Sequence, residues 1–183
     1  MRGQDQRYHL EIDFLDAARG TTRRITMPAG GPGNATLDVT IPPGVQDATV
    51  LRLKGKGAPG VGGGPAGDAL VELAVRPHPR FRREGDDVVL ELPVTLDEAV
   101  LGASVEVPTI SGRVQMTVPK GSSSGDVLRL KGRGIKARGG HGDQRVVLKV
   151  VLPDRVDPEL EAFLTRWREA HRYDPRADLR RET

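Results

Sequence analysis

Hydrophobic and polar residues alternate in several short stretches of the chain. Every second residue is hydrophobic from position 8 to position 14, and the same alternation recurs at positions 37–41 and 114–118. Successive side chains of a β-strand point to opposite faces, so a period of two predicts a strand with one buried face. Turns containing proline and glycine follow the second and third of these stretches. The pattern therefore predicts an all-β protein built from short strands.

This strand pattern occurs twice in the chain. The segment VLRLKGKG returns as VLRLKGRG with one conservative change, and the match extends over residues 37–57 and 114–134. Downstream, residues 67–75 match residues 142–150. The order of the matching segments is the same in both halves, so we predict two copies of one all-β unit of roughly 75 residues.

Each copy is expected to hold about five short strands, arranged as a small β-sandwich or a partly open barrel. The predicted fold class is therefore all-β, with two tandem units of the same topology and a helix at the C-terminus. We divide the chain into a linker remnant (1–5), a first β-unit that binds peptide (6–80), a second β-unit (81–153), and a C-terminal helix and tail (154–183).

The C-terminal segment follows a helical pattern. Asp157 is a suitable N-cap, and Pro158 suits the first helical position. Four hydrophobic residues then share one helical face: Leu160, Phe163, Leu164 and Trp167. This stripe packs either on the second β-unit or on a second chain, and tryptophan is a residue favoured in interfaces. Residues 173–183 are expected to form a turn and a charged tail.

Composition narrows the class of protein. Only 3% of the 183 residues are aromatic, so the cores must consist of Val, Leu and Ile. The absence of cysteine excludes disulfides, thiolate catalysis and cysteine-ligated zinc. No stretch resembles a signal peptide or a membrane span, so we expect a soluble cytoplasmic protein without a membrane partner. The net charge of +3 is compatible with an acidic partner but does not require one.

Enzyme motifs are weak throughout the sequence. GKGAPG formally fits the dinucleotide pattern GxGxxG, but Pro59 and the glycines after it cannot open the helix that such a site needs. The four histidines are scattered and form no HExxH motif, so we expect neither a metal nor another cofactor. The sequence therefore indicates a binding protein and no enzyme.

Two surfaces are candidates for binding. Arg23, Ile25 and Met27 share one face of a predicted strand, and an extended peptide could add to this strand if it lies at a sheet edge. Periodicity alone favours an ordinary core position for Ile25 and Met27. Basic residues in or beside the glycine loops form the second surface: Lys54, Lys56, Lys131, Arg133, Lys136 and Arg138. These loops either contact phosphates, as in DNA, or are simply solvated.

Several long motifs, in the same order, resemble the C-terminal substrate-binding region of DnaJ-type co-chaperones. They are FLDAARGTTRRI, IPPGVQDATVLRLKGKG, GDALVELAVRPHPRFRREGDDV and LDEAVLGASVEVPTISGRVQMTVPKG, within residues 6–153. The resemblance implies two β-sandwich units, a C-terminal segment that forms a homodimer, and delivery of unfolded polypeptides to a DnaK-type chaperone. By position it implies a peptide-binding groove at Tyr8, Ile25, Met27 and Phe81, with Arg23 meeting an acidic tail of the partner chaperone.

Parts of the full family pattern are missing from this sequence. It has no J-domain with His-Pro-Asp, no Gly/Phe-rich linker and no cysteine-rich zinc module. We therefore expect a fragment of a longer protein of the zinc-free class, in its CbpA-like branch, which is also associated with DNA binding. Two hypotheses follow: a client-binding co-chaperone module, and a nucleoid module that binds DNA through basic loops. DNA binding would weaken steeply with salt, whereas apolar peptide binding would barely weaken.

Overall fold

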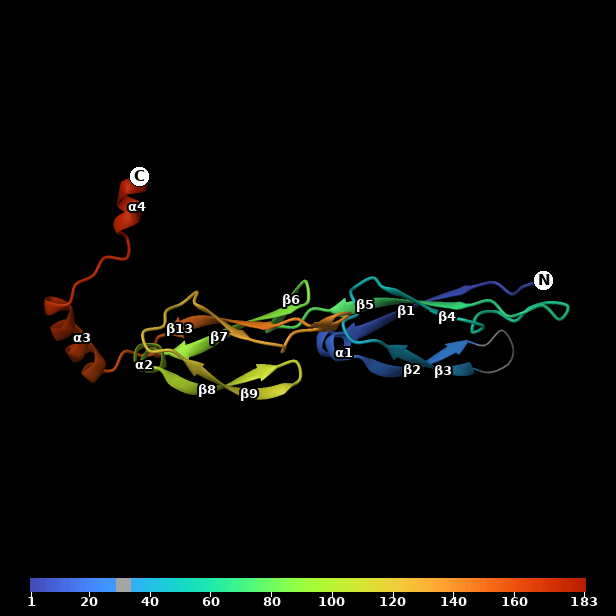
Figure 1. Ribbon diagram of the computed structural model, residues 1–183, viewed down its shortest axis with the longest axis horizontal. Coiled ribbons are helices and arrows are strands. Elements are labelled where there is room, and N and C mark those ends of the chain that lie inside the picture. Colours follow the sequence, from blue (N-terminus) through green and yellow to red (C-terminus); the bar gives the residue numbers. More distant parts are fainter. Residues whose placement is uncertain (29–33) are drawn as a thin grey trace. The chain divides into compact units, whose positions relative to one another are not determined.

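Strands make up most of the regular structure of the computed structural model, which describes residues 1–28 and 34–183 (Figure 1). The chain divides into two compact units, Met1–Val150 and Val151–Thr183. The first contains nearly all of the strand residues together with two short helices, and the second contains two further helices. The predicted all-β fold class with a C-terminal helix is confirmed.

The first half of Met1–Val150 is a two-layered β-unit. Its elements are β1 (Gln6–Asp13), α1 (Phe14–Arg19), β2 (Thr21–Pro28), β3 (Asn34–Ile41), β4 (Val50–Leu53) and β5 (Ala69–Arg76). One layer is a sheet of strand order β1-β5-β4, in which β1 runs parallel to β5 and β4 runs antiparallel to it. The other layer is the antiparallel ribbon β2-β3. Between them lies a core that includes Ile12, Val39 and Leu73.

The second half repeats this order of elements and adds three strands. Its elements are β6 (Phe81–Glu84), β7 (Asp87–Thr95), α2 (Leu96–Leu101), β8 (Ala103–Thr109), β9 (Gly112–Val118), β10 (Val127–Leu130), β11 (Lys136–Ala137), β12 (Gly140–His141) and β13 (Gln144–Val151). Here the larger sheet has the order β10-β13-β7-β6, and β8 pairs with β9. Strand β6 and the small ribbon β11-β12 have no counterpart among the described residues of the first β-unit.

Helix α1 belongs to both cores. Ala17 is buried in the core of the first β-unit, whereas the next residue, Ala18, is buried in the core of the second. Phe14 and Leu15, at the start of the helix, also pack against the second core. Alanine has the highest helix propensity and its small side chain permits close approach on both sides. The two β-units are therefore joined through one short helix as well as through the chain that connects them.

The duplicated VLRLKG segment forms the same lock in both halves. In the first, the Gly55 N–H donates to Asp68 Oδ1 (2.9 Å) and Arg52 Nη1 donates to Asp68 Oδ2 (2.7 Å). In the second, Asp143 accepts from the Gly132 N–H (2.8 Å) and from Arg129 Nη1 (2.8 Å). The backbone N–H groups of the two glycines, followed by the arginines, lower the pKa of both aspartates. The repeated motif thus fixes a turn against the neighbouring strand.

The Val151–Thr183 unit contains α3 (Pro158–Ala170) and α4 (Ala177–Glu182). Asp157 Oδ1 accepts from the Leu160 N–H (2.9 Å) and Pro158 occupies the first turn, as the sequence predicted. Residues 177–182 form a helix where only a charged tail was expected; Asp178 in its first turn and two arginines in its last turn complement the helix dipole. None of the helices in the described ranges is long and apolar enough to cross a membrane.

Candidate polypeptide-binding site

The inner face of the first β-unit is only partly covered. Burial along β1 falls with distance from α1, because Ile12 is fully buried while Leu10 and Tyr8 are half-buried. Burial along β3 falls in the same direction, from Val39 to the half-buried Leu37. We define the apolar strip as the half-buried residues of this face on β1, β2 and β3: Tyr8, Leu10, Ile25 and Leu37. It offers apolar area that a further segment can cover.

The second β-unit buries two of the four positions equivalent to the apolar strip. Leu90 and Val107, which occupy the positions of Tyr8 and Ile25 in the repeat, are buried. Gln144 is also fully buried in this unit and donates through Nε2 to the Pro108 carbonyl (2.9 Å). The two copies thus differ at these two positions, whereas Leu92 and Val114, which match Leu10 and Leu37, are half-buried in the second copy as well.

Strand β6 accounts for part of this difference. It pairs antiparallel with β7, and Phe81 lies opposite Leu90 in the register. In the first β-unit the strand equivalent to β7 is β1, which is the outermost strand of its sheet among the described residues. The outer edge of β1 therefore has backbone N–H and C=O groups without a strand partner, where the second β-unit has a complete fourth strand.

Phe81 does not lie on the apolar strip. Its side chain is 7% exposed and belongs to the core of the second β-unit. The ring stacks on Phe14 (centroids 6.3 Å apart) and lies 4.9 Å from the ring of His78. His78 Nδ1 accepts the N–H groups of Arg80 (2.9 Å) and Phe81 (3.1 Å). The PHPRF motif therefore holds the junction between the β-units, and the structure does not bring Phe81 together with Tyr8 and Ile25.

Arg23 and Ile25 lie on one face of β2, as the period of two predicted. Arg23 Nη2 is 2.8 Å from Asp16 Oδ2 on α1, so this guanidinium already has a carboxylate partner. An acidic tail would have to share Arg23 with Asp16 or displace it. The backbone of Met27 pairs with Ala35 in the β2-β3 ribbon, but its side chain lies outside the described part of the structure.

Leu10 and Leu37 are members of the strip that the sequence interpretation did not single out. Both belong to the alternating stretches that predicted strands, so their shared face with Tyr8 and Ile25 was readable from the period of two. Their partial exposure was not readable, because it depends on how the two layers pack on each other.

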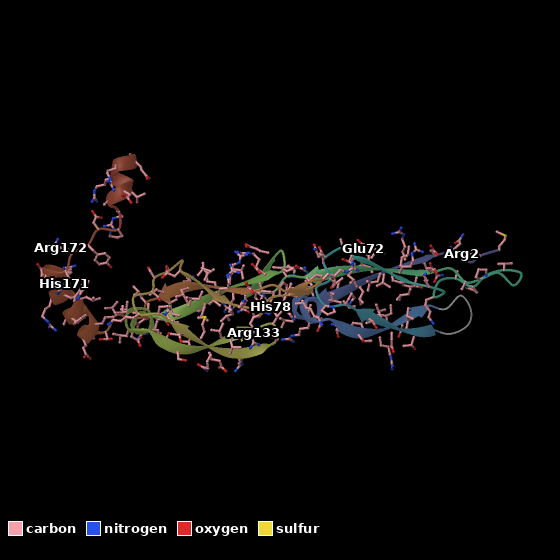
Figure 2. The ribbon with its side chains drawn as sticks, viewed as in Figure 1. Arg2, Glu72, His78, Arg133, His171 and Arg172 are labelled. Carbon is pink, nitrogen blue, oxygen red and sulfur yellow. The ribbon has the colours of Figure 1, made fainter. Side chains whose placement is uncertain are left out.

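The six basic loop residues do not form one surface. Lys54 and Lys56 follow β4, in a loop whose Val61 N–H donates to the Met1 carbonyl (3.0 Å). The other four, at positions 131–138, belong to the loop that approaches Gly44 at the junction of the β-units. In Figure 2, Arg2, which pairs with Asp68 of the first lock, and Arg133 lie far apart within this compact unit.

The stripe on α3 is accessible. Phe163, Leu164 and Trp167 are 51%, 41% and 39% exposed, Leu160 is partly buried, and the helix has no buried residue. The indole of Trp167 stacks on His171, one turn further along (5.1 Å between centroids). The α3 helix by itself does not cover this stripe.

The described residues thus form two tandem β-sandwich units of related topology, and the first has an open edge beside half-buried apolar side chains. The chain belongs to the DnaJ C-terminal domain family, whose family model matches residues 6–153. This membership confirms the resemblance found in the sequence motifs.

Individual relatives have two kinds of name. The chain is 40% identical over 187 residues to a curved DNA-binding protein of Coxiella burnetii, covering 97% of this chain and 59% of that protein. It is 44% identical over 146 residues to the chaperone protein DnaJ 2 of Mycolicibacterium paratuberculosis, covering 78% of this chain and 37% of that protein. It is 48% identical over 122 residues to the chaperone protein DnaJ of Bacillus velezensis, covering 66% and 32%. The chain thus spans well under two thirds of the length of these relatives.

Proposed function

We propose that this chain is the client-binding module of a co-chaperone, which holds unfolded polypeptide on its first β-unit for delivery to a DnaK-type chaperone. The observation that carries the proposal is the unpartnered edge of β1 beside the apolar strip. The second β-unit has the same architecture with that edge occupied by β6, so the chain itself contains an example of the bound arrangement.

In this arrangement an extended client segment pairs with the edge of β1. Backbone hydrogen bonds give binding that is independent of the client sequence, and alternate client side chains pack on the strip. Phe81 is the internal analogue, since it lies opposite Leu90, the equivalent of Tyr8. We therefore expect a preference for a large hydrophobic client side chain next to Tyr8.

The strip supports weak binding. Covering on the order of 300 Å² of apolar area contributes about 7 kcal/mol at ~25 cal/mol per Å². Association and ordering costs remove several kcal/mol of this, which leaves an affinity that is roughly micromolar. Dimerisation through Leu160, Phe163, Leu164 and Trp167 would give two strips per particle and raise the affinity for long clients by avidity. Release to the next chaperone stays easy, since each site alone is weak.

A second candidate function is DNA binding, because one relative is named as a curved DNA-binding protein. The basic residues proposed for it occupy two separate loops, so one duplex would have to reach both. Its signature would be a steep loss of affinity with rising salt. Binding of unfolded client at the strip would change little over the same range. Cytoplasmic location stays a prediction.

The experiment is a fluorescence-anisotropy titration of a labelled, permanently unfolded client. It compares the wild-type chain with Tyr8→Ser/Ile25→Ser and with the control Leu92→Ser/Val105→Ser, which changes two residues of the second β-unit. All four residues are half-buried hydrophobic or aromatic side chains of the two β-units. We expect the first pair to weaken binding at least tenfold and the control pair to leave it within twofold. Equal loss in both, with folding verified by circular dichroism, would remove the first β-unit as the client site.

A further inference from the structure

A second candidate site lies at the junction of the two β-units, within the Met1–Val150 unit. It is a recess of about 470 Å³ between α1, the turn that joins β8 to β9, and the loop carrying β11 and β12. Four basic side chains line it: Arg19, Arg133, Lys136 and His141. Apolar side chains of Ala18, Pro43 and Ile110 line the rest, and no carboxylate takes part.

In the described part of the chain, the basic groups of the recess lack counter-charges, whereas many arginines elsewhere are paired. Arg23, Arg52, Arg129 and Arg145 all form ion pairs with aspartate or glutamate. Within the described ranges, none of the four basic residues of the recess forms an ion pair. Like charges gathered around a partly enclosed space repel one another, so an anion placed among them would relieve this repulsion.

The recess is held by specific contacts. Arg19 Nε donates to the carbonyl of Ile110 on the far side, which fixes its guanidinium across the junction. Lys136 and His141 are direct cross-strand partners in the β11-β12 ribbon. The Ile135 N–H donates to the Asp86 carbonyl (2.8 Å), which anchors the base of this ribbon.

The internal duplication shows that the recess is not required by the fold. The matching loop of the first β-unit, after β4, contains no ribbon and leads toward the N-terminus. The lock made by aspartate, arginine and glycine is present in both copies, although only the second copy has the recess. The ribbon with its basic pair is therefore a feature of the second copy alone, at the place where that copy meets α1.

We propose that the recess binds a chain of linked phosphates, of the kind found in tripolyphosphate and longer polyphosphates. Two guanidiniums can each bind phosphate oxygens through paired hydrogen bonds, and Lys136 adds a further positive charge. The space exceeds the size of one phosphate group, and its three-sided form suits a narrow flexible chain better than a duplex. Because α1 and Pro43 belong to the first β-unit and Ile110 and the β11-β12 loop to the second, a bound phosphate chain also ties the two β-units together.

The test measures binding of sodium tripolyphosphate by isothermal titration calorimetry, and the melting temperature with and without it at constant ionic strength. The variant is Arg133→Gln/Lys136→Gln. The control is Lys54→Gln/Lys56→Gln, which removes the same charge from the matching loop of the first copy. We expect saturable binding and a raised melting temperature for the wild type and the control, and at least tenfold weaker binding for the variant.

Three outcomes would overturn the proposal. Equal weakening in variant and control would show that tripolyphosphate responds only to net charge. Equal affinity for orthophosphate would show that linkage of the phosphates is irrelevant. Displacement of tripolyphosphate by a short DNA duplex at equal phosphate concentration would assign the recess to DNA. The client-binding titration is independent of all three, because the strip and the recess share no residue.

Discussion

Gly44 and Gly121 occupy equivalent turns of the two β-units. Replacing each by alanine distinguishes the cost of backbone strain, which both sites share, from the cost of steric contact at the junction, which only Gly44 has. Both have positive φ, +81° and +77° respectively. A Cβ atom on Gly44 would lie 2.8 Å from Ile135 Cγ2 and 2.8 Å from the Lys136 carbonyl oxygen. A Cβ atom on Gly121 would meet no heavy atom within 4 Å.

The expected costs differ accordingly. A left-handed backbone conformation costs an alanine about 1 to 2 kcal/mol, and this applies at both positions. Overpacking against a backbone carbonyl and a buried isoleucine adds about 1 to 3 kcal/mol at Gly44 alone. We therefore expect Gly121→Ala to lower the free energy of unfolding by about 1 kcal/mol and Gly44→Ala to lower it by about 3 kcal/mol.

Urea unfolding followed by circular dichroism measures both values, with the slope of the transition checked for constancy between variants. Gly55→Ala serves as a further control, because its φ is +72° and its surroundings are also open. Equal losses at Gly44 and Gly121 would refute the reasoning, since they would mean that the loop at Ile135 does not bear on the turn at Gly44.

Two further predictions concern the repeated lock and the C-terminal helix. The pKa of Asp143 is lowered below its ordinary value by the Gly132 N–H and then by Arg129. The stabilisation that the ionised Asp143 gives is therefore complete above about pH 4, and it is lost as the pH falls through the folded-state pKa. Asp143→Asn should therefore be less stable than the wild type at pH 7 and should show a shallower fall in melting temperature between pH 5 and 3; parallel curves would contradict this. Trp167→Ser should halve the mass seen by sedimentation equilibrium, whereas Leu179→Ser on α4 should not, and a monomeric wild type would refute dimerisation through the stripe.

The sequence predicted most of the strand pattern because alternation and internal repetition are local properties. The shared face of Arg23 and Ile25, and the N-cap at Asp157, were readable for the same reason. The position of Phe81 was not, because it depends on β6 joining the sheet of the second β-unit and on α1 reaching across to that core. Motif order alone placed Phe81 near Tyr8.

The glycine loops are a second feature that the sequence alone could not predict. Lys54 and Lys56 looked like part of one phosphate-binding surface with the second glycine loop, but their own loop contacts the N-terminus through the Val61 N–H and the Met1 carbonyl. The recess at Arg133 and Lys136 gains Arg19 from a helix far away in the sequence, and no local pattern connects them. Contacts between distant segments decided which basic residues gather and which stay apart.

The sharing of α1 between two cores has a consequence for how the protein unfolds and how it can be cut. A fragment ending near residue 80 would keep the helix but leave Phe14, Leu15 and Ala18 without the surface they cover. Unfolding of either β-unit would likewise expose side chains of α1 and so destabilise the other β-unit. The two β-units should therefore unfold in a single cooperative transition. Although it contains an internal repeat, Met1–Val150 is expected to behave as one folding unit. A destabilising substitution in either β-unit should therefore lower the stability of both.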